Sequence, residues 1–157
     1  MTQDDIRALF TYEPSGTLRQ IAGRVPYPWR PVGKNGRYLA ATVRGKNIYL
    51  HRAVFLWHHG WLPEQIDHTN GNAADNRVEN LRPCTNAQNQ YNAPRKSHNR
   101  SGFKGVAYCT GYRNPWRARI VVQGKPILLG RFQTAEEAHA AYVEGAKQYA
   151  GEFARAA

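Results

Sequence analysis

Short runs of hydrophobic residues, separated by polar turns, recur along the chain and predict where its elements lie. Residues 37–52 (RYLAATVRGKNIYLHR) hold two such runs on either side of Arg44-Gly45-Lys46-Asn47, a pattern that predicts a β-hairpin. In residues 51–60 (HRAVFLWHHG) apolar side chains cluster before Gly60. That cluster predicts a short buried helix that ends at the glycine.

The hydrophobic pattern is clearest in the C-terminal third. Residues 105–108 (GVAY), 116–124 (WRARIVVQG) and 126–132 (PILLGRF) predict three strands joined by turns that contain Gly and Asn. A helix is then expected from Thr134, which can form a capping box with Glu137, to a stop at Gly151. Small and apolar residues share one face of this helix and are expected to pack on the sheet: Ala138, Ala141, Tyr142, Gly145 and Tyr149.

The middle of the chain is dominated by asparagine. Residues 66–92 read IDHTNGNAADNRVENLRPCTNAQNQYN, and seven of these 27 residues are Asn. Residues 64–67 and 78–84 are strand candidates on either side of a long polar turn, and residues 85–92 are a short helix candidate. Residues 93–102 have the composition of a linker. The whole pattern predicts an α+β fold.

Composition excludes several classes of protein. The chain has 157 residues, a formal charge of +11 and a pI of about 10.1. It has no apolar run of the roughly 20 residues that a membrane span requires, and its acidic start is unlike a secretory signal. Two cysteines, Cys84 and Cys109, cannot supply a disulfide framework or a four-cysteine zinc site. We expect free thiols in a reducing, cytoplasmic compartment.

The positive charge is concentrated in one long segment. No acidic residue occurs between Glu79 and Glu136, and aromatic residues are interleaved with the cations there. Such a segment repels itself unless a polyanion neutralises it, and clustered Lys and Arg favour the phosphates of nucleic acid. The alternative is a solvated basic surface that aids solubility. The ten cations are Arg82, Arg95, Lys96, Arg100, Lys104, Arg113, Arg117, Arg119, Lys125 and Arg131.

Asp67 and His68 form the one Asp-His pair of the chain and stand next to the asparagine-rich turn. Carboxylate and amide oxygens suit magnesium, and a neutral imidazole can take a proton from water. Together these groups could hydrolyse a phosphodiester. In a regular strand, however, adjacent side chains point to opposite faces. The residue types alone therefore leave open an aspartate that caps a turn beside a hydrogen-bonded histidine.

The motifs DH, DNRVENLR and TNAQNQYN resemble the signature of HNH endonucleases of the phage and homing type, as does the preceding YLHRAVFLWHHGWLPEQIDH. The resemblance implies a metal finger of two strands and one helix. It implies that His68 is the base, that Asp67 and Asn89 bind a divalent metal, Mg²⁺ or alternatively Mn²⁺, and that Asn80 braces the loop and orients the base. Asn76 and Asn92 are then hydrogen bonders of the loop and the helix. His51 is interpreted as a histidine that caps the buried helix, with a supporting role in the site as the alternative.

Residues 101–154 resemble the Apetala-two/ethylene-response-factor (AP-two/ERF) DNA-binding domain. The residues that carry this resemblance are GV, LGRFQTAEEAHAAY and the final GEFA. The resemblance implies a three-stranded antiparallel sheet, backed by one helix, that binds DNA through the sheet. Lys104 and Ala107 stand at positions where that family often has Arg, so its target sequence is not carried over.

Both resemblances lead to one prediction. The chain is expected to be a metal-dependent endonuclease that nicks double-stranded DNA, works as a monomer in solution and uses no membrane and no organic cofactor. The alternative is a DNA-binding regulator with a non-catalytic HNH-like scaffold. The expected parts are residues 1–47 as an extension with a hairpin, 48–94 as the nuclease module, 95–100 as a basic linker and 101–157 as the DNA-binding domain. Tyr108 and Trp116 join the ten cations as expected DNA-contacting residues.

Overall fold

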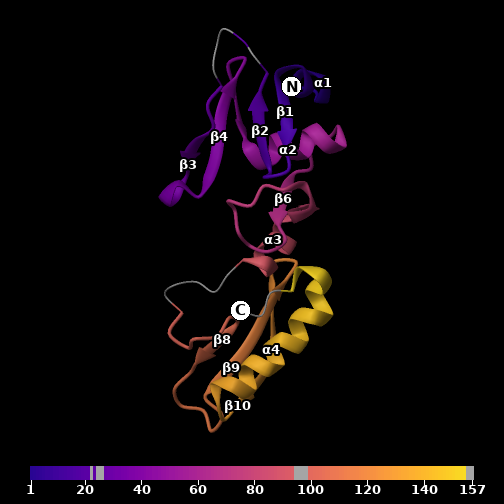
Figure 1. Cartoon of the computed structure of the whole chain (residues 1–157). Helices are drawn as coiled ribbons and strands as arrows, with labels where there is room; N and C mark the ends of the chain where they lie inside the picture. Colours follow the sequence, from indigo (N-terminus) through magenta and orange to yellow (C-terminus); the bar gives the residue numbers. More distant parts are fainter. Residues whose placement is uncertain (22, 24–26, 94–98, 155–157) are drawn as a thin grey trace. The chain divides into compact units, whose positions relative to one another are not determined.

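The computed structural model describes residues 1–21, 23, 27–93 and 99–154, which belong to two compact units (Figure 1). The first unit is Met1–Cys84 and the second is Thr85–Ala157. The boundary falls inside the range 48–94 that the sequence assigns to the nuclease module. Most of the expected basic linker, residues 95–98, lies outside the described residues.

The first unit is built from short strands and two α-helices. The strands form a two-stranded sheet β1-β2, a three-stranded sheet in the order β3-β4-β5, and a two-stranded sheet β6-β7, all antiparallel. In chain order the elements are α1 Gln3–Leu9, β1 Phe10–Glu13, β2 Thr17–Gln20, β3 Arg30–Val32, η1 Lys34–Gly36, β4 Tyr38–Val43, β5 Lys46–Tyr49, α2 Leu50–His59, β6 Gln65–His68, η2 Val78–Asn80 and β7 Leu81–Cys84.

Helix α2 forms the centre of the first core. It buries five consecutive or near-consecutive apolar side chains between Leu50 and Leu56, and its C-terminal cap is Gly60 in the left-handed conformation (φ 78°). The helix therefore ends where the sequence predicted, but its N-cap is Tyr49, without a side-chain hydrogen bond, so His51 is not the cap. The hairpin of β4 and β5 is also present, and Arg44 and Gly45 form its turn with positive φ angles of 49° and 76°. Ile6, Phe10 and Leu18 complete the core from α1, β1 and β2.

The sequence did not predict the hairpin of β1 and β2. Its turn contains Gly16, at φ 85°, and this turn packs against the backbone of Asn76 and Arg77. A Cβ atom on residue 16 would lie 2.4 Å from the Arg77 nitrogen. The hydroxyl of Tyr12 on β1 also accepts a hydrogen bond from the Val78 amide at 3.3 Å. The N-terminal hairpin thus supports the asparagine-rich loop.

The expected strand over residues 78–84 is shorter than predicted. Val78–Asn80 forms a single 3₁₀ turn, and the strand begins at Leu81. The correction has a local cause, because the amide of Asn80 bonds to the carbonyl of Arg77 and closes a turn where a strand would be extended.

The second unit contains the predicted three-stranded antiparallel sheet backed by one helix. Its order is β10-β9-β8, and α4 lies along this sheet (Figure 1). Thr134 caps α4 with the predicted capping box to Glu137, and Gly151 is the C-terminal cap. The elements are α3 Asn86–Asn92, β8 Val106–Tyr108, β9 Trp116–Val122, β10 Lys125–Phe132, α4 Ala135–Ala150 and η3 Gly151–Phe153.

The face of α4 that packs on the sheet differs from the prediction at one residue. Ala138, Tyr142 and Gly145 are buried as expected, whereas Tyr149 is 40% exposed. Ala146 and Ala150 are buried instead. They lie four and eight residues after Tyr142, so they continue the buried face of the helix. Gly145 permits close packing, since a Cβ there would lie 2.8 Å from Leu129.

Helix α3 belongs to the second unit, whereas β6 and β7 belong to the first. The side chain of Tyr91 packs against a cluster of Ile120, Tyr142 and Ala146, and its hydroxyl donates to the carbonyl of Val121 at 2.6 Å. The predicted finger of two strands and one helix is therefore divided between the two units. Among the described residues, no helix is both long and apolar enough to cross a membrane.

The turn at Gly16 makes a prediction about stability. Gly16→Ala should lower the free energy of unfolding by at least about 2 kcal/mol, because the added methyl group overlaps backbone atoms as well as straining a positive φ. Gly45→Ala is the matched control, since Gly45 also has a positive φ (76°) but nothing lies within 4 Å of its Cβ position. Thermal or denaturant unfolding measures both variants. Equal losses would show that the overlap with Arg77 does not constrain the fold.

Candidate functional site

The ladder between β6 and β7 positions the Asp-His pair. Asp67 lies opposite Arg82, and His68, the last residue of β6, lies opposite Leu81. Both side chains are buried, with 4% and 6% of their surfaces exposed. Burial of two polar side chains requires hydrogen-bond partners, and the two residues find different ones.

Arg82 is the partner of Asp67. Its Nε and Nη2 atoms both donate to Oδ2 of the carboxylate, at 3.0 and 2.9 Å. The Arg82 side chain is only 14% exposed, so this ion pair is largely shielded from water. From the sequence, Arg82 was expected to contact DNA as one of the cations in the segment that has no acidic residue. In the structure its guanidinium instead faces the carboxylate that was expected to bind metal.

Asn76 is a partner of His68. The Nε2 atom of the imidazole lies 3.3 Å from Oδ1 of Asn76, and Asn76 is itself buried. An amide oxygen only accepts, so the contact favours the tautomer with its proton on Nε2 and its lone pair on Nδ1. Burial lowers the pKa of His68, while Asn76 and then Asp67 act in the opposite direction. The imidazole is accordingly held in its neutral form near pH 7.

Aromatic rings from α2 and β4 contact the same histidine. The His51 ring meets the His68 ring edge-on at 5.4 Å between centroids, and the Tyr38 ring lies 6.4 Å from it. Tyr49 stacks on His51 at 5.5 Å. Burial, followed by the influence of His68 and Arg52, lowers the pKa of His51 to about 3. His51 is therefore neutral and forms one wall of the His68 site.

The asparagines between the two strands hold the loop by side-chain hydrogen bonds. Asn80 connects two parts of this loop. The Asn80 Oδ1 atom accepts a hydrogen bond from the Asn70 amide at 3.0 Å, and the Asn80 Nδ2 atom donates to the Asp75 carbonyl at 2.7 Å. Asn70 and Asn72 each accept a hydrogen bond from the amide two residues on, at 2.8 and 3.1 Å. These short side chains replace the backbone ladder that a loop lacks.

An ion pair closes the same loop near Asn76. Two guanidinium nitrogens of Arg77 donate to the Asp75 carboxylate at 2.9 and 2.8 Å, and Asn70 donates to it at 2.9 Å. The hydrogen bond from Arg77 is the main reason why the pKa of Asp75 is lowered. The Asp75 carboxylate thus accepts hydrogen bonds from residues before and after it in the loop, Asn70 and Arg77, and holds both in place.

Asn89, the other expected metal ligand, lies on α3 in the second unit. Its backbone amide and carbonyl take part in the helical hydrogen bonds to Thr85 and Ala93. Within the described ranges, no cluster of three or more His, Cys, Asp or Glu side chains could hold a metal ion. A structural zinc centre, which needs about four such ligands, has no basis in these residues.

The outer face of the C-terminal sheet carries part of the acid-free segment. Arg117 on β9 lies opposite Arg131 on β10 and Ala107 on β8, and Arg119 is exposed two residues further on. The guanidinium of Arg131 stacks over the Tyr112 ring at 3.5 Å. Nε of Arg117 and Nη1 of Arg131 have no hydrogen-bond partner among the described residues. Two adjacent cations without a counter-charge favour an anionic ligand.

Other expected DNA-contacting residues have different surroundings. Lys104 donates to the carbonyls of Tyr91 and Ala93 and so satisfies the C-terminal end of α3. Trp116 packs with Val106, Ala118 and Ala138 on the side covered by α4, and Tyr108 meets its edge at 5.0 Å while remaining exposed. Arg100, Arg113 and Lys125 are exposed, and Arg95 and Lys96 lie outside the described residues.

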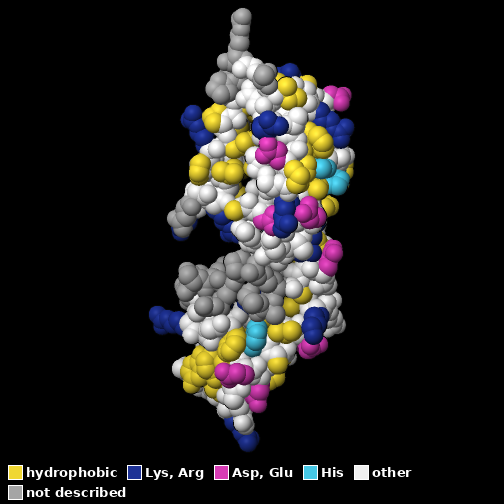
Figure 2. Space-filling model, in the orientation of Figure 1, with side chains coloured by type: hydrophobic (Ala, Val, Ile, Leu, Met, Phe, Trp, Pro, Cys, Tyr) yellow, Lys and Arg dark blue, Asp and Glu magenta, His cyan; other side chains and the backbone are white. Residues whose placement is uncertain are grey.

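The visible face of the molecule shows how these charges are distributed. Lys and Arg side chains are spread over both units and interspersed with Asp and Glu, instead of gathering in a single patch (Figure 2).

The sequence did not assign contacts with the candidate base to three residues. Asn76 was interpreted as a general hydrogen bonder of the loop, Tyr38 was not singled out, and His51 was interpreted first as a helix cap. Tyr38 and His51 lie 30 and 17 residues before His68 in the chain, so no local spacing connects them with it. The density of asparagine was the one signal that pointed toward Asn76.

The two hydrogen bonds of Asn80 lead to a second prediction. Asn80→Ala should destabilise the chain by about 2 kcal/mol or more, because it leaves the Asn70 amide and the Asp75 carbonyl without their partner. Asn72→Ala is the control, since Asn72 is exposed and accepts one local hydrogen bond. Hydrogen exchange of the Asn70 amide, together with the unfolding free energy, measures the effect. The account of the loop fails if both variants behave alike.

Comparison with known proteins adds an independent observation. Residues 48–91 match the family model of the HNH endonucleases. The chain is 31% identical over 78 residues to Protein 3.8 of Escherichia phage T7, covering 47% of this chain and 64% of that protein. It is 32% identical over 131 residues to an uncharacterized HNH endonuclease of Acanthamoeba polyphaga mimivirus, covering 82% of this chain and 65% of that protein. The chain thus matches less than two thirds of the length of either relative.

No solved structure matches the chain. The resemblance of residues 101–154 to the AP-two/ERF domain stays a prediction. The family match runs from β5 through the Asp-His pair and the asparagine loop into α3, so residues 48–91 are similar to an HNH endonuclease domain.

Proposed function

We propose that the chain is a metal-dependent DNA endonuclease that prefers particular sites and cuts one strand at a time. The observation that carries the proposal is a buried His68, held by Asn76 and next in the chain to the buried Asp67, within the segment that matches the HNH endonuclease model. An imidazole in this state suits a general base near neutral pH. The net charge of +11 suits a polyanionic substrate.

In the proposed reaction, His68 takes a proton from a water molecule through Nδ1. The water oxygen forms a bond to phosphorus as the bond between phosphorus and the leaving sugar oxygen breaks. Asn76 accepts the proton of Nε2 and keeps the ring oriented, and His51 and Tyr38 limit the access of bulk water to the ring. Asn80 keeps the loop in the shape that presents His68.

The donor chemistry fits a divalent metal with oxygen ligands. Asp67 supplies a carboxylate, and Mg²⁺ commonly takes few protein ligands because it keeps waters and binds substrate phosphates. The role of Asn89 as a second ligand stays a prediction. The ion would stabilise the charge on the leaving oxygen. Mn²⁺ takes similar ligands. For Asp67 to serve, Arg82 must share or release the carboxylate, and we propose that the guanidinium then meets a DNA phosphate.

The C-terminal sheet is proposed as the main DNA-binding surface, because Arg117, Arg119 and Arg131 share its outer face. With one candidate base in the chain, a monomer would hydrolyse one phosphodiester at a time. The proposed setting is the host cell of a phage or other mobile element, since one relative comes from a phage and the other from a mimivirus.

One observation favours the second candidate function, a DNA-binding regulator whose HNH domain is only a scaffold. The ion pair between Asp67 and Arg82 satisfies the carboxylate without a metal. The two functions differ in a simple assay, because only the nuclease converts supercoiled plasmid to open circles when magnesium is added.

The third prediction concerns the base itself. His68→Ala should lower the nicking rate by roughly 10²–10⁴-fold while leaving the Kd for duplex DNA near that of the unchanged chain, because a general base acts in the chemical step. His59→Ala is the control, since His59 is exposed at the end of α2. Plasmid nicking and fluorescence anisotropy measure the two effects. Equal losses of nicking and binding would instead assign His68 a structural role.

The fourth prediction concerns pH. Burial places the pKa of His68 below its ordinary value of 6.5. The imidazole therefore stays unprotonated, and able to act as a base, until the pH falls to this lowered pKa. The acid limb of kcat/KM for nicking should therefore have its midpoint below pH 6.5. A midpoint above pH 6.5 would contradict the neutral, desolvated imidazole.

A further inference from the structure

A second acid-free segment lies in the N-terminal half of the chain. No Asp or Glu occurs between Glu13 and Glu64, and this stretch contains eight cations. They are Arg19, Arg24, Arg30, Lys34, Arg37, Arg44, Lys46 and Arg52.

Three of these cations are already engaged within the protein. Arg19 pairs with Glu13 at 2.8 Å, and Arg44 pairs with Asp5 at 2.6 Å. Arg52 donates to the carbonyls of Pro63 and Glu64. Arg24 lies outside the described residues.

The remaining four are exposed and have no acidic partner in the described part of the chain: Arg30, Lys34, Arg37 and Lys46. They belong to one sheet and its connections. Arg30 is on β3, Lys34 and Arg37 are in or next to the connection to β4, and Lys46 begins β5. Their uncompensated charge makes this sheet attractive to a polyanion.

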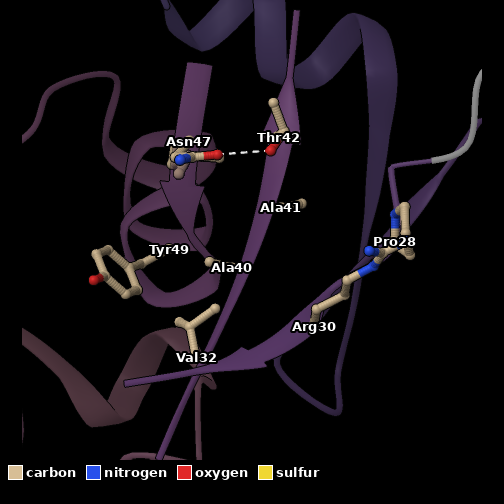
Figure 3. Close-up of a pocket in the computed structure, with 9 residues that line it drawn as sticks. Pro28, Arg30, Val32, Ala40, Ala41, Thr42, Asn47 and Tyr49 are labelled. Atoms are coloured by element: carbon tan, nitrogen blue, oxygen red, sulfur yellow. Dashed lines mark hydrogen bonds between the residues drawn. The ribbon is translucent and has the colours of Figure 1, made fainter. Parts of the chain in front are cut away.

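A groove with a volume of about 420 Å³ crosses the same sheet. Strand register aligns Arg30, Ala40 and Tyr49 in one row across β3, β4 and β5. Figure 3 shows Tyr49 and Asn47 at one side of the groove and Arg30 and Pro28 at the other, with Ala40 and Ala41 between them. Ala40 has a small side chain on the same face as Arg30 and Tyr49 and forms a low floor, on which a ligand backbone can lie close to the sheet.

The side chains of the groove suit a sugar-phosphate backbone. The guanidinium of Arg30 can donate two parallel hydrogen bonds to a phosphate. Thr42 donates to Oδ1 of Asn47 at 2.6 Å, so the amide nitrogen of Asn47 is the group that can donate to a ligand. Tyr49 is 44% exposed and offers a ring on which a sugar or base can stack.

Two contacts between aromatic rings connect Tyr49, at one side of the groove, with the candidate base. Tyr49 stacks on His51 at 5.5 Å, and His51 meets His68 at 5.4 Å. A nucleic-acid strand held in the groove and stacked on Tyr49 would therefore lie near the residues that surround the proposed base, His68.

We propose that the groove of the β3-β4-β5 sheet, lined by Arg30, Asn47 and Tyr49, binds the phosphodiester backbone of DNA beside the cleavage site. The inference rests on the proposed nuclease function and assigns the N-terminal unit a grip on the substrate of its own, separate from that of the C-terminal sheet. Because this contact is equally present before and during the reaction, it should affect binding and KM more than kcat.

The test uses the full chain and a fluorescein-labelled duplex of mixed sequence in EDTA, over a series of sodium chloride concentrations. Arg30→Gln should raise Kd roughly tenfold and reduce the slope of log K against log salt by about 1, as expected for one lost phosphate contact. Arg19→Gln is the matched control, since it removes the same charge from an exposed arginine that pairs with Glu13 outside the groove. It should leave both quantities near those of the unchanged chain.

Photo-crosslinking with a bromodeoxyuridine-substituted duplex gives a second, local measurement. We expect a crosslink in the tryptic peptide 47–52, which contains Tyr49. If Arg30→Gln matches Arg19→Gln in Kd and salt slope, and peptide 47–52 is not crosslinked while the unchanged chain still nicks plasmid, the groove proposal is overturned and the nuclease proposal stands. If the groove effects appear but magnesium produces no nicking, the groove binds DNA and the nuclease proposal fails.

Discussion

His68 ends a strand in the interior of the first unit, and the surrounding structure depends on keeping that buried imidazole hydrogen-bonded. A buried polar group without a partner costs folding free energy, so the loop that follows must bring one to it. Asn76 does this, and it can do so only while the loop keeps its shape. Asn80, Asn70 and the pair of Asp75 with Arg77 maintain that shape.

The N-terminal hairpins also help to hold the asparagine-rich loop in its shape, through contacts from outside the loop. The turn at Gly16 packs against the backbone of Asn76 and Arg77, and Tyr12 accepts a hydrogen bond from Val78. Tyr38 and His51 cover the imidazole ring. The N-terminal residues are thus part of the environment of the candidate base, and the groove on β3-β4-β5 ends at Tyr49, whose ring stacks on His51. This part of the chain therefore supports the loop, shields the His68 ring from water and carries the proposed DNA-binding groove.

Elements with strong local signals could be predicted from the sequence. Helix α2 ends at Gly60, α4 begins at the capping box of Thr134, and the three C-terminal strands are present as expected, because caps and periodicity depend on residues close in the chain. The pairing of Asp67 with Arg82, the capping of α3 by Lys104 and the contact between His51 and His68 depend on residues 11 to 17 positions apart. Nothing in a single sequence specifies such contacts. Asn89 was assigned by resemblance, and α3 packs in the second unit because Tyr91 finds its apolar partners there.

The state of the His68 ring can be observed directly by long-range ¹H–¹⁵N correlation spectroscopy on the full chain near pH 7. The chain has six histidines, and loss of one set of signals in His68→Gln assigns the relevant pair of nitrogens. The account predicts a neutral ring with the proton on Nε2, fixed by Asn76, and a shift of that signal in Asn76→Ala. A protonated ring, or a neutral ring with the proton on Nδ1, would contradict the account, because neither leaves Nδ1 able to accept a proton from water.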